Sequence, residues 1–112
     1  GKTIIKEWLY QLLSVDFSIC KNPGSDNSQI GVPLSVWQLQ DYHDLAIFEA
    51  GISQPGEMDA LARIIQPTVG LFTNIGPAHD EGFKSRQEKI REKMKLFQSA
   101  QTLIFCRDHT AI

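Results

Sequence analysis

The chain has 112 residues, of which 42% are hydrophobic and 21% charged, and its formal net charge is -2. This length suits one domain, and the composition is that of a globular protein rather than a disordered one. The nearly neutral charge argues against a nucleic-acid groove, and no apolar run approaches the roughly 20 residues of a membrane helix.

The start of the chain and the two cysteines indicate a compartment. Lys2, Lys6 and Glu7 interrupt the beginning of the sequence, which argues against a signal peptide. Cys20 and Cys106 lie far apart and show no metal-binding spacing. They predict buried, reduced thiols in a cytoplasmic protein.

Hydrophobic periodicity predicts helices and strands in alternation. Apolar residues at helical spacing give the first helix one apolar face, formed by Ile4, Ile5, Trp8, Leu9 and Leu12. The predicted helices cover residues 2–13, 33–39, 57–65 and 86–99. The predicted strands cover residues 15–20, 45–48, 69–72 and 102–105.

This alternation defines the expected fold class. The last three predicted strands are continuous apolar runs, which are typical of strands covered on both faces. We therefore predict an α/β fold with a mostly parallel sheet flanked by helices. The alternative is a mixed sheet in which residues 15–20 pair antiparallel at one edge.

Polar side chains follow the predicted strands where ligands bind in parallel sheets. Glu49 comes directly after strand 45–48, and Asn74 follows strand 69–72, with His79 further along the same loop. Lys2 and Thr3 begin the first helix. Because ligands bind beyond the carboxyl ends of the strands, we expect these groups to meet at one rim of the sheet.

The first three residues, Gly1-Lys2-Thr3, match the end of a phosphate-binding loop, G-x-x-x-x-G-K-[ST]. In that motif the amides of a helix N-terminus hold phosphate, the lysine neutralises it and the hydroxyl binds Mg²⁺. Three residues alone are equally compatible with an ordinary helix start.

Three further side chains have both a functional and a structural interpretation. Glu49 is either a hard oxygen ligand for Mg²⁺ or a loop carboxylate. His79 is either part of a site or a structural histidine. Lys93 flanks the apolar stripe of helix 86–99: its partly desolvated amine could react with CO₂ to give a metal-binding carbamate, or its stem packs while its ammonium reaches water. Lys89, Arg91 and Lys95 are expected to be solvated charges.

Taken together, five segments resemble the central ATP-binding domain of the Mur ligase family. They are Gly1-Lys2-Thr3, the run 27–34 (NSQIGVPL), the run 49–57 with Glu49-Ala50-Gly51, the run 73–79 (TNIGPAH) and the run 93–97 (KMKLF). The resemblance covers residues 1 to about 97. It is greatest to the branch of the family that joins UDP-N-acetylmuramoyl-tripeptide to D-alanyl-D-alanine in peptidoglycan synthesis.

The resemblance implies an ATP-dependent amide ligase that works through an acyl phosphate, with ATP and Mg²⁺ as cofactors. Its partners would be UDP-N-acetylmuramoyl-tripeptide and D-alanyl-D-alanine. It also implies that residues 1–112 are a partial central domain, truncated at both ends and lacking the UDP-binding and C-terminal domains. Such a piece is expected to be inactive by itself and to self-associate through an exposed sheet edge.

The resemblance also implies roles for individual residues. Gly1, Lys2, Thr3 and Asn74 would contact ATP, and Thr3 with Glu49 would hold one Mg²⁺. His79 and a carbamylated Lys93 would hold a second Mg²⁺, so that Lys2, His79 and Lys93 form the catalytic set. Asn27 and Ser28 would face the substrate. Family members often carry an acidic residue two places after the modified lysine, where this sequence has Lys95.

Two alternatives remain at this point. One is another ligase of the superfamily, of the folylpolyglutamate or cyanophycin synthetase type. The other is a non-catalytic α/β module that binds a partner through a hydrophobic edge.

Overall fold

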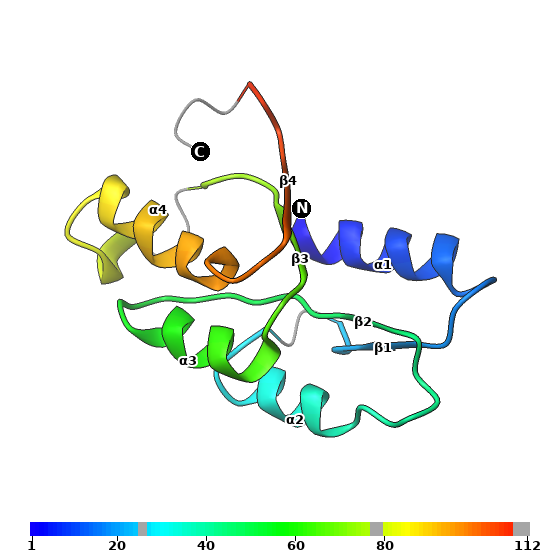
Figure 1. The fold of residues 1–112 in the computed structure, drawn as a ribbon. Coiled ribbons are helices and arrows are strands. Elements are labelled where there is room, and N and C mark those ends of the chain that lie inside the picture. The colour runs from blue at the N-terminus through cyan, green and yellow to red at the C-terminus, as the bar shows by residue number, and fades with distance from the viewer. Residues whose placement is uncertain (25–26, 77–79, 109–112) are drawn as a thin grey trace. The chain divides into compact units, whose positions relative to one another are not determined.

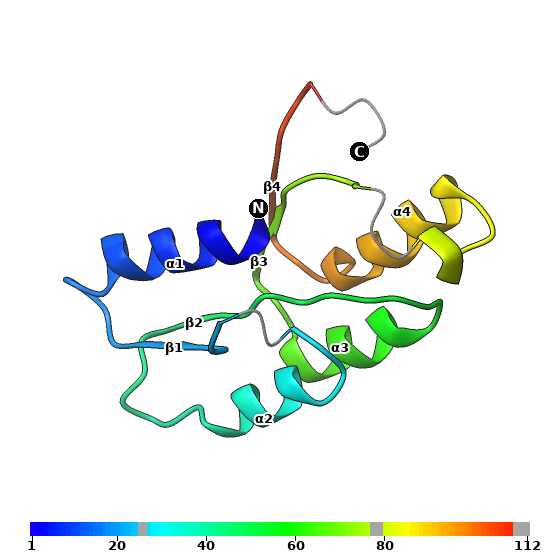
Figure 2. The same ribbon diagram turned by 180° about the vertical axis from the view of Figure 1, so that it is seen from behind.

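A computed structural model describes residues 1–24, 27–76 and 80–108 of the chain. The chain divides into two compact units, Gly1–Gly51 and Ile52–Ile112 (Figures 1 and 2). Each unit contains a pair of parallel strands, β1–β2 in the first and β3–β4 in the second.

The first unit consists of α1 (Lys2–Leu13), β1 (Ile19–Lys21), α2 (Gly31–Trp37) and β2 (Leu45–Ile47). In the parallel ladder of β1 and β2, Cys20 lies opposite Ala46. Figure 1 shows α1 on one side of this strand pair and α2 on the other. Because the strands are parallel, their carboxyl ends lie side by side, with Lys21 opposite Ile47. The residues that follow the two strands therefore begin at the same edge of the ladder.

The second unit consists of α3 (Glu57–Ile65), β3 (Val69–Phe72), η1 (Asp80–Gly82), α4 (Arg86–Met94), η2 (Lys95–Phe97) and β4 (Thr102–Phe105). In the parallel ladder of β3 and β4, Gly70 lies opposite Leu103. The short helix η2 contacts both α3 and β3. The buried apolar side chains that the structure describes in this unit are Ile52, Met58, Leu61, Phe72 and Phe83.

Helix ends in the second unit follow from local chemistry. Ser85 is the N-cap of α4, where its hydroxyl accepts a hydrogen bond from the Glu88 amide, and Glu88 in turn accepts one from the Lys84 amide. This reciprocal arrangement is a variant of the capping box. Gly56 and Gln66, which flank α3, both have left-handed backbone angles, with φ of 89° and 49°. Such residues stop helical propagation.

The predicted fold class is confirmed, because both strand pairs are parallel and alternate with helices. The mixed-sheet alternative is wrong, since β1 pairs parallel with β2. That strand starts only at Ile19, because the chain after α1 turns and the Phe17 amide bonds to the Leu13 carbonyl. Helix α2 begins two residues before Pro33, and the predicted helix 86–99 ends at Met94 and continues as η2.

Burial differs from the prediction on the strands. Val69, Leu71 and Ile104 are 58%, 38% and 52% exposed, and Ala46 in β2 is also exposed, so none of these three strands is covered on both faces. In β3 exposure alternates along the strand, which is typical of a strand with one buried face. Of the two cysteines, Cys20 is buried, which raises the pKa of its thiol, whereas Cys106 is exposed and the prediction for it is wrong.

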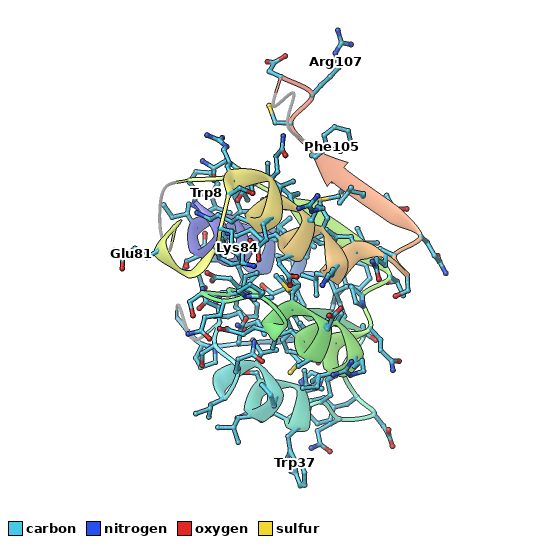
Figure 3. All side chains as sticks on the ribbon, turned by 90° about the vertical axis from the view of Figure 1, so that its left-hand side faces the viewer. Trp8, Trp37, Glu81, Lys84, Phe105 and Arg107 are labelled. Carbon is cyan, nitrogen blue, oxygen red and sulfur yellow. The ribbon has the colours of Figure 1, made fainter. Side chains whose placement is uncertain are left out.

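The buried face of helix α1 matches the prediction only in part. Ile5 and Leu9 are half-buried, but the other three residues of the predicted apolar face, Ile4, Trp8 and Leu12, are exposed, whereas Lys6 is buried. The face that packs against β1 therefore carries a charge. On α2, Trp37 also points away from the unit and is exposed (Figure 3). In the part of the chain that the structure describes, no helix has the length and apolarity needed to cross a bilayer.

Gly70 lies where η2 touches β3, and this contact supports a prediction. A Cβ at Gly70 would lie 2.2 Å from Phe97 Cδ1, and the Phe97 ring already packs edge-on against Phe72. We expect Gly70→Ala to lower the free energy of unfolding by about 1–3 kcal/mol, the usual cost of overpacking. Chemical denaturation measures this change.

The control for this prediction is Gly76→Ala, since a Cβ at Gly76 would meet no atom of the described residues within 4 Å. Its effect should stay within about 0.5 kcal/mol. Adding Phe97→Leu to Gly70→Ala should restore part of the loss. Equal stability of the two alanine variants would contradict the packing argument.

Candidate functional site

Glu49 lies at the centre of the first unit's polar site, two residues after the end of β2. The Glu49 amide donates to Asn22 Oδ1 at 2.9 Å, and Asn22 Nδ2 donates to the Glu49 carbonyl at 2.8 Å. Asn22, which is fully buried, follows directly after β1. Its side chain thus continues the strand pairing beyond the backbone ladder and fixes the backbone of Glu49.

The Glu49 carboxylate has partners from two other segments. Thr3 Oγ1, in the first turn of α1, lies 3.0 Å from Oε1 and 2.9 Å from Oε2. Asn27 Nδ2 donates to Oε1 at 2.9 Å. Glu49 is buried, with 7% of its surface exposed. Two neutral donors, Thr3 and Asn27, hold its carboxylate beside the first turn of α1.

Lys6 supplies the positive charge at this carboxylate. Its Nζ lies 3.6 Å from Glu49 Oε2 and donates to the Asn22 carbonyl at 2.7 Å and to the Gly24 carbonyl. The side chain is 3% exposed, and Glu7 lies 3.8 Å away at its outer side. A buried lysine is tolerated only when its charge and hydrogen-bond donors are satisfied, and this one satisfies both conditions.

The segment after Glu49 must be small. The Gly51 amide donates to the Asn27 carbonyl at 2.8 Å, and a Cβ at Gly51 would lie 2.9 Å from Asn27 Cγ. A larger residue would displace the amide that binds the carboxylate. Glycine at position 51 is therefore a packing requirement of the site.

The N-terminus of α1 has the features of an anion site. Its N-cap is Gly1, which has no side chain, and its first turn carries no acidic residue. The first amides of a helix lack intrahelical acceptors and carry a partial positive charge. Lys2 is exposed beside them. The N-terminus of α1 thus combines free amides, the Lys2 ammonium and the Thr3 hydroxyl. The Glu49 carboxylate lies next to this hydroxyl.

In the second unit, α4 holds the loop that follows β3. Lys89 Nζ donates to the Gly76 carbonyl at 2.5 Å, and Arg86 Nη2 donates to the Ile75 carbonyl at 3.4 Å. Lys89 is 1% exposed, so the prediction that it is a solvated charge is wrong. Its stem is buried because its ammonium binds the loop rather than water.

Lys93 follows Lys89 by four residues and therefore shares a face of α4 with it. Lys93 is half-buried. This placement is compatible with a lysine directed toward the loop after β3. Asn74 is exposed in that loop, and its Oδ1 accepts a hydrogen bond from Thr73 Oγ1 at 3.5 Å. His79 lies outside the described residues.

Lys95 is not a solvated charge either. Its Nζ lies 2.7 Å from Glu92 Oε1 and 3.3 Å from Asp59 Oδ2, so it joins α4 and η2 to α3. The hydrogen bond from Lys95, together with one from the Gly56 amide, lowers the pKa of Glu92, and the same Glu92 contact raises the pKa of Lys95. Lys95 thus forms structural ion pairs with Glu92 and Asp59.

The predicted site residues are in part brought together. Thr3 and Glu49 meet in the first unit, as the expected rim requires, and Asn27, which is predicted to face the substrate, donates to the same carboxylate. Ser28 instead accepts a hydrogen bond from the Gly31 amide and so supports the start of α2. Lys93 belongs to the second unit, and its meeting with Glu49 stays a prediction. Among the described residues, no three His, Cys, Asp or Glu side chains form a metal-binding group.

Comparison with known proteins extends this geometry. The family model for the Mur ligase middle domain matches residues 1–112, which is the whole chain. The chain belongs to the Mur ligase middle-domain family. This membership confirms the family resemblance found in the sequence.

Two relatives in this family share sequence over most of the chain. The UDP-N-acetylmuramoyl-tripeptide–D-alanyl-D-alanine ligase of Borreliella burgdorferi is 43% identical over 96 residues, which are 86% of this chain and 21% of that protein. The ligase of the same name from Treponema pallidum is 36% identical over 97 residues, or 87% of this chain and 21% of that protein. The chain thus spans about a fifth of the length of these relatives.

Solved structures of family members share the fold. A crystal structure of MurF from Acinetobacter baumannii matches with a TM-score of 0.91 and 31% identity, over 98% of this chain and 25% of that one. MurF ligase from Thermotoga maritima, crystallised in complex with ADP, matches with a TM-score of 0.86 and 32% identity, over 96% of this chain and 26% of that one. The two units of this chain are therefore part of the Mur ligase middle-domain fold.

Proposed function

We propose that this chain is the ATP-binding core of a ligase that joins D-alanyl-D-alanine to UDP-N-acetylmuramoyl-tripeptide in peptidoglycan synthesis. The observation that carries the proposal is the contact between the Thr3 hydroxyl and the Glu49 carboxylate at the N-terminus of α1. The names of the relatives support the substrates, and the ADP complex of the Thermotoga maritima enzyme supports the nucleotide. A ligase with nucleotide-linked substrates would act in the cytoplasm.

The residues present fit a magnesium ion. A hydroxyl and a carboxylate are hard oxygen donors of the kind that Mg²⁺ binds together with phosphate oxygens. Thr3 and Glu49 provide such a pair within hydrogen-bond distance of each other. When bound there, the ion would neutralise the phosphate charge that develops during phosphoryl transfer.

The chain's own groups would act chiefly by positioning and charge. The amides of the first turn of α1 would hold the phosphates of ATP, and the exposed Lys2 would neutralise them. The terminal carboxylate of the tripeptide would attack the γ-phosphorus, forming an acyl phosphate and releasing ADP. The amine of D-alanyl-D-alanine would then attack the acyl carbon, and phosphate would leave.

Lys93 and His79 are proposed as the pair that supports the acyl phosphate, with a carbamate on Lys93 as a second metal ligand. The support is the anchoring of the loop after β3 by Arg86 and Lys89, from the same face of α4 that carries Lys93. Asn74, in the same loop, is proposed to contact ATP, and Asn27 and Ser28 to border the substrate. The rest of the enzyme would supply the UDP-binding domain and a C-terminal domain.

The proposal is tested in a ligase that contains this chain together with the rest of the enzyme. Phosphate release from ATP is expected only when UDP-N-acetylmuramoyl-tripeptide and D-alanyl-D-alanine are both present. The control omits each substrate in turn. Phosphate release driven by folate and glutamate would replace this substrate assignment with a folylpolyglutamate synthetase.

A further inference from the structure

We propose that Lys6 is a positioning residue that holds the Glu49 carboxylate in place for metal binding at the nucleotide site. This inference rests on the proposed function, because it assigns a task to the site described there. It concerns a residue three positions after Thr3 on the same face of α1. Lys6 is the charge that the packed face of this helix buries.

The contacts of Lys6 connect α1 to the segment after β1 and to Glu49 after β2. Its ammonium bonds the carbonyls of Asn22 and Gly24 and lies 3.6 Å from Glu49 Oε2. Asn22 in turn holds the backbone of Glu49 through both its amide and its carbonyl. The buried ammonium of Lys6 therefore helps to position both the Glu49 carboxylate and Asn22, whose side chain fixes the backbone of Glu49.

The donors around Glu49 divide its two oxygens unequally. Oε1 receives the Asn27 amide, whereas the charge of Lys6 lies next to Oε2. Thr3 contacts both oxygens. Without Lys6, the contact that remains at Oε2 among the described residues is the Thr3 hydroxyl, and the carboxylate would be less constrained about χ3, which is a broad torsion.

A structural role alone does not account for this arrangement. Lys21 forms an ion pair with Glu7 at 2.9 Å on the outer side of α1, and its Nζ lies over the Tyr10 ring. That pair already ties the helix to β1 without touching Glu49. Burying a second lysine is costly unless its charge is needed at that place.

The test measures Mn²⁺ binding by electron paramagnetic resonance, with a non-hydrolysable ATP analogue, in the ligase that contains this chain. Lys6→Met is expected to weaken Mn²⁺ binding about 10-fold, a typical loss for a group that orients a metal ligand. In a Glu49→Gln background the same substitution should have less than about a twofold effect, since its route of action is gone. Lys6→Arg should recover most of the binding.

The matched control is Lys21→Met, which removes a lysine of the same unit that does not touch Glu49, and it should leave Mn²⁺ binding unchanged. Hydrogen exchange of the metal-free protein gives a second measurement: the amides of residues 22–24 and 49 should exchange faster in Lys6→Met. If Lys6→Met does not fold, Lys6→Gln replaces it, because its amide still reaches a carbonyl, with the same expected result.

Three outcomes would overturn the proposal. A simple Coulomb effect predicts that removing a cation tightens binding of a divalent metal, so tighter or unchanged Mn²⁺ binding in Lys6→Met rejects the positioning role. The proposal is also rejected if the effects of Lys6→Met and Glu49→Gln on the Mn²⁺ dissociation constant multiply in the double variant, because the two residues would then act independently. If Glu49→Gln by itself leaves Mn²⁺ binding unchanged, the metal assignment of the proposed function fails, and with it the role of Lys6.

Discussion

Replacing Glu49 by glutamine is expected to reduce ATP-dependent phosphate release roughly 100-fold at limiting Mg²⁺. The amide keeps an acceptor for Asn27 and a donor for Thr3, so the change removes charge while it preserves most contacts. Loss of even an outer partner of a metal ligand typically costs about 10- to 100-fold. Activity as a function of Mg²⁺ concentration measures the effect, and high Mg²⁺ should restore part of it.

The control for this prediction is Asp44→Asn. Asp44 is an exposed carboxylate of the same unit that accepts a hydrogen bond from the Ser18 amide, and it precedes β2, whereas Glu49 follows this strand. Its Mg²⁺ dependence should match that of the wild type. A normal Mg²⁺ dependence of Glu49→Gln would show that Glu49 is not part of the metal site. If activity is lost, a thermal unfolding curve like that of the wild type shows that the loss does not come from unfolding.

The fold was predictable where local signals and tertiary packing agree. Helix 57–65 and strand 69–72 have the predicted bounds, because Pro67 and the turn at Gly56 mark their limits in the sequence. The rule that ligands gather at the carboxyl ends of parallel strands also placed Glu49 beside Thr3 correctly. These features depend on short-range sequence patterns and on the parallel topology that alternating helices and strands predict.

The charged interior could not be found in the same way. Lys6 and Lys89 lie on helices that read as amphipathic, so a periodicity argument directs apolar residues inward and lysines outward. Each is buried because a carbonyl of a distant segment, at Asn22 or Gly76, accepts a hydrogen bond from its ammonium. Such a partner is a property of the tertiary structure. The one usable signal was the spacing of Lys6 from Thr3, which puts both on one face.

Replacing Lys93 by alanine is expected to have the largest effect on turnover, a loss of about 1000-fold, comparable with removal of a group that stabilises charge in the transition state. A carbamate on Lys93 would add a negative oxygen ligand that no unmodified lysine offers. Its place on the loop-facing side of α4, four residues after Lys89, favours this role over that of a solvated charge.

Chemical rescue distinguishes this role from a structural one. If Lys93 acts through a carbamate, short carboxylic acids such as acetate should restore part of the activity of Lys93→Ala, because they bring a carboxylate into the vacated space. Arg91→Ala is the matched control, since Arg91 is exposed on the same helix, and it should be active and insensitive to acetate. An alanine variant at position 93 with wild-type activity would make Lys93 a packing residue whose stem covers the apolar stripe of α4. The metal ligands at the acyl phosphate would then have to come from another part of the enzyme.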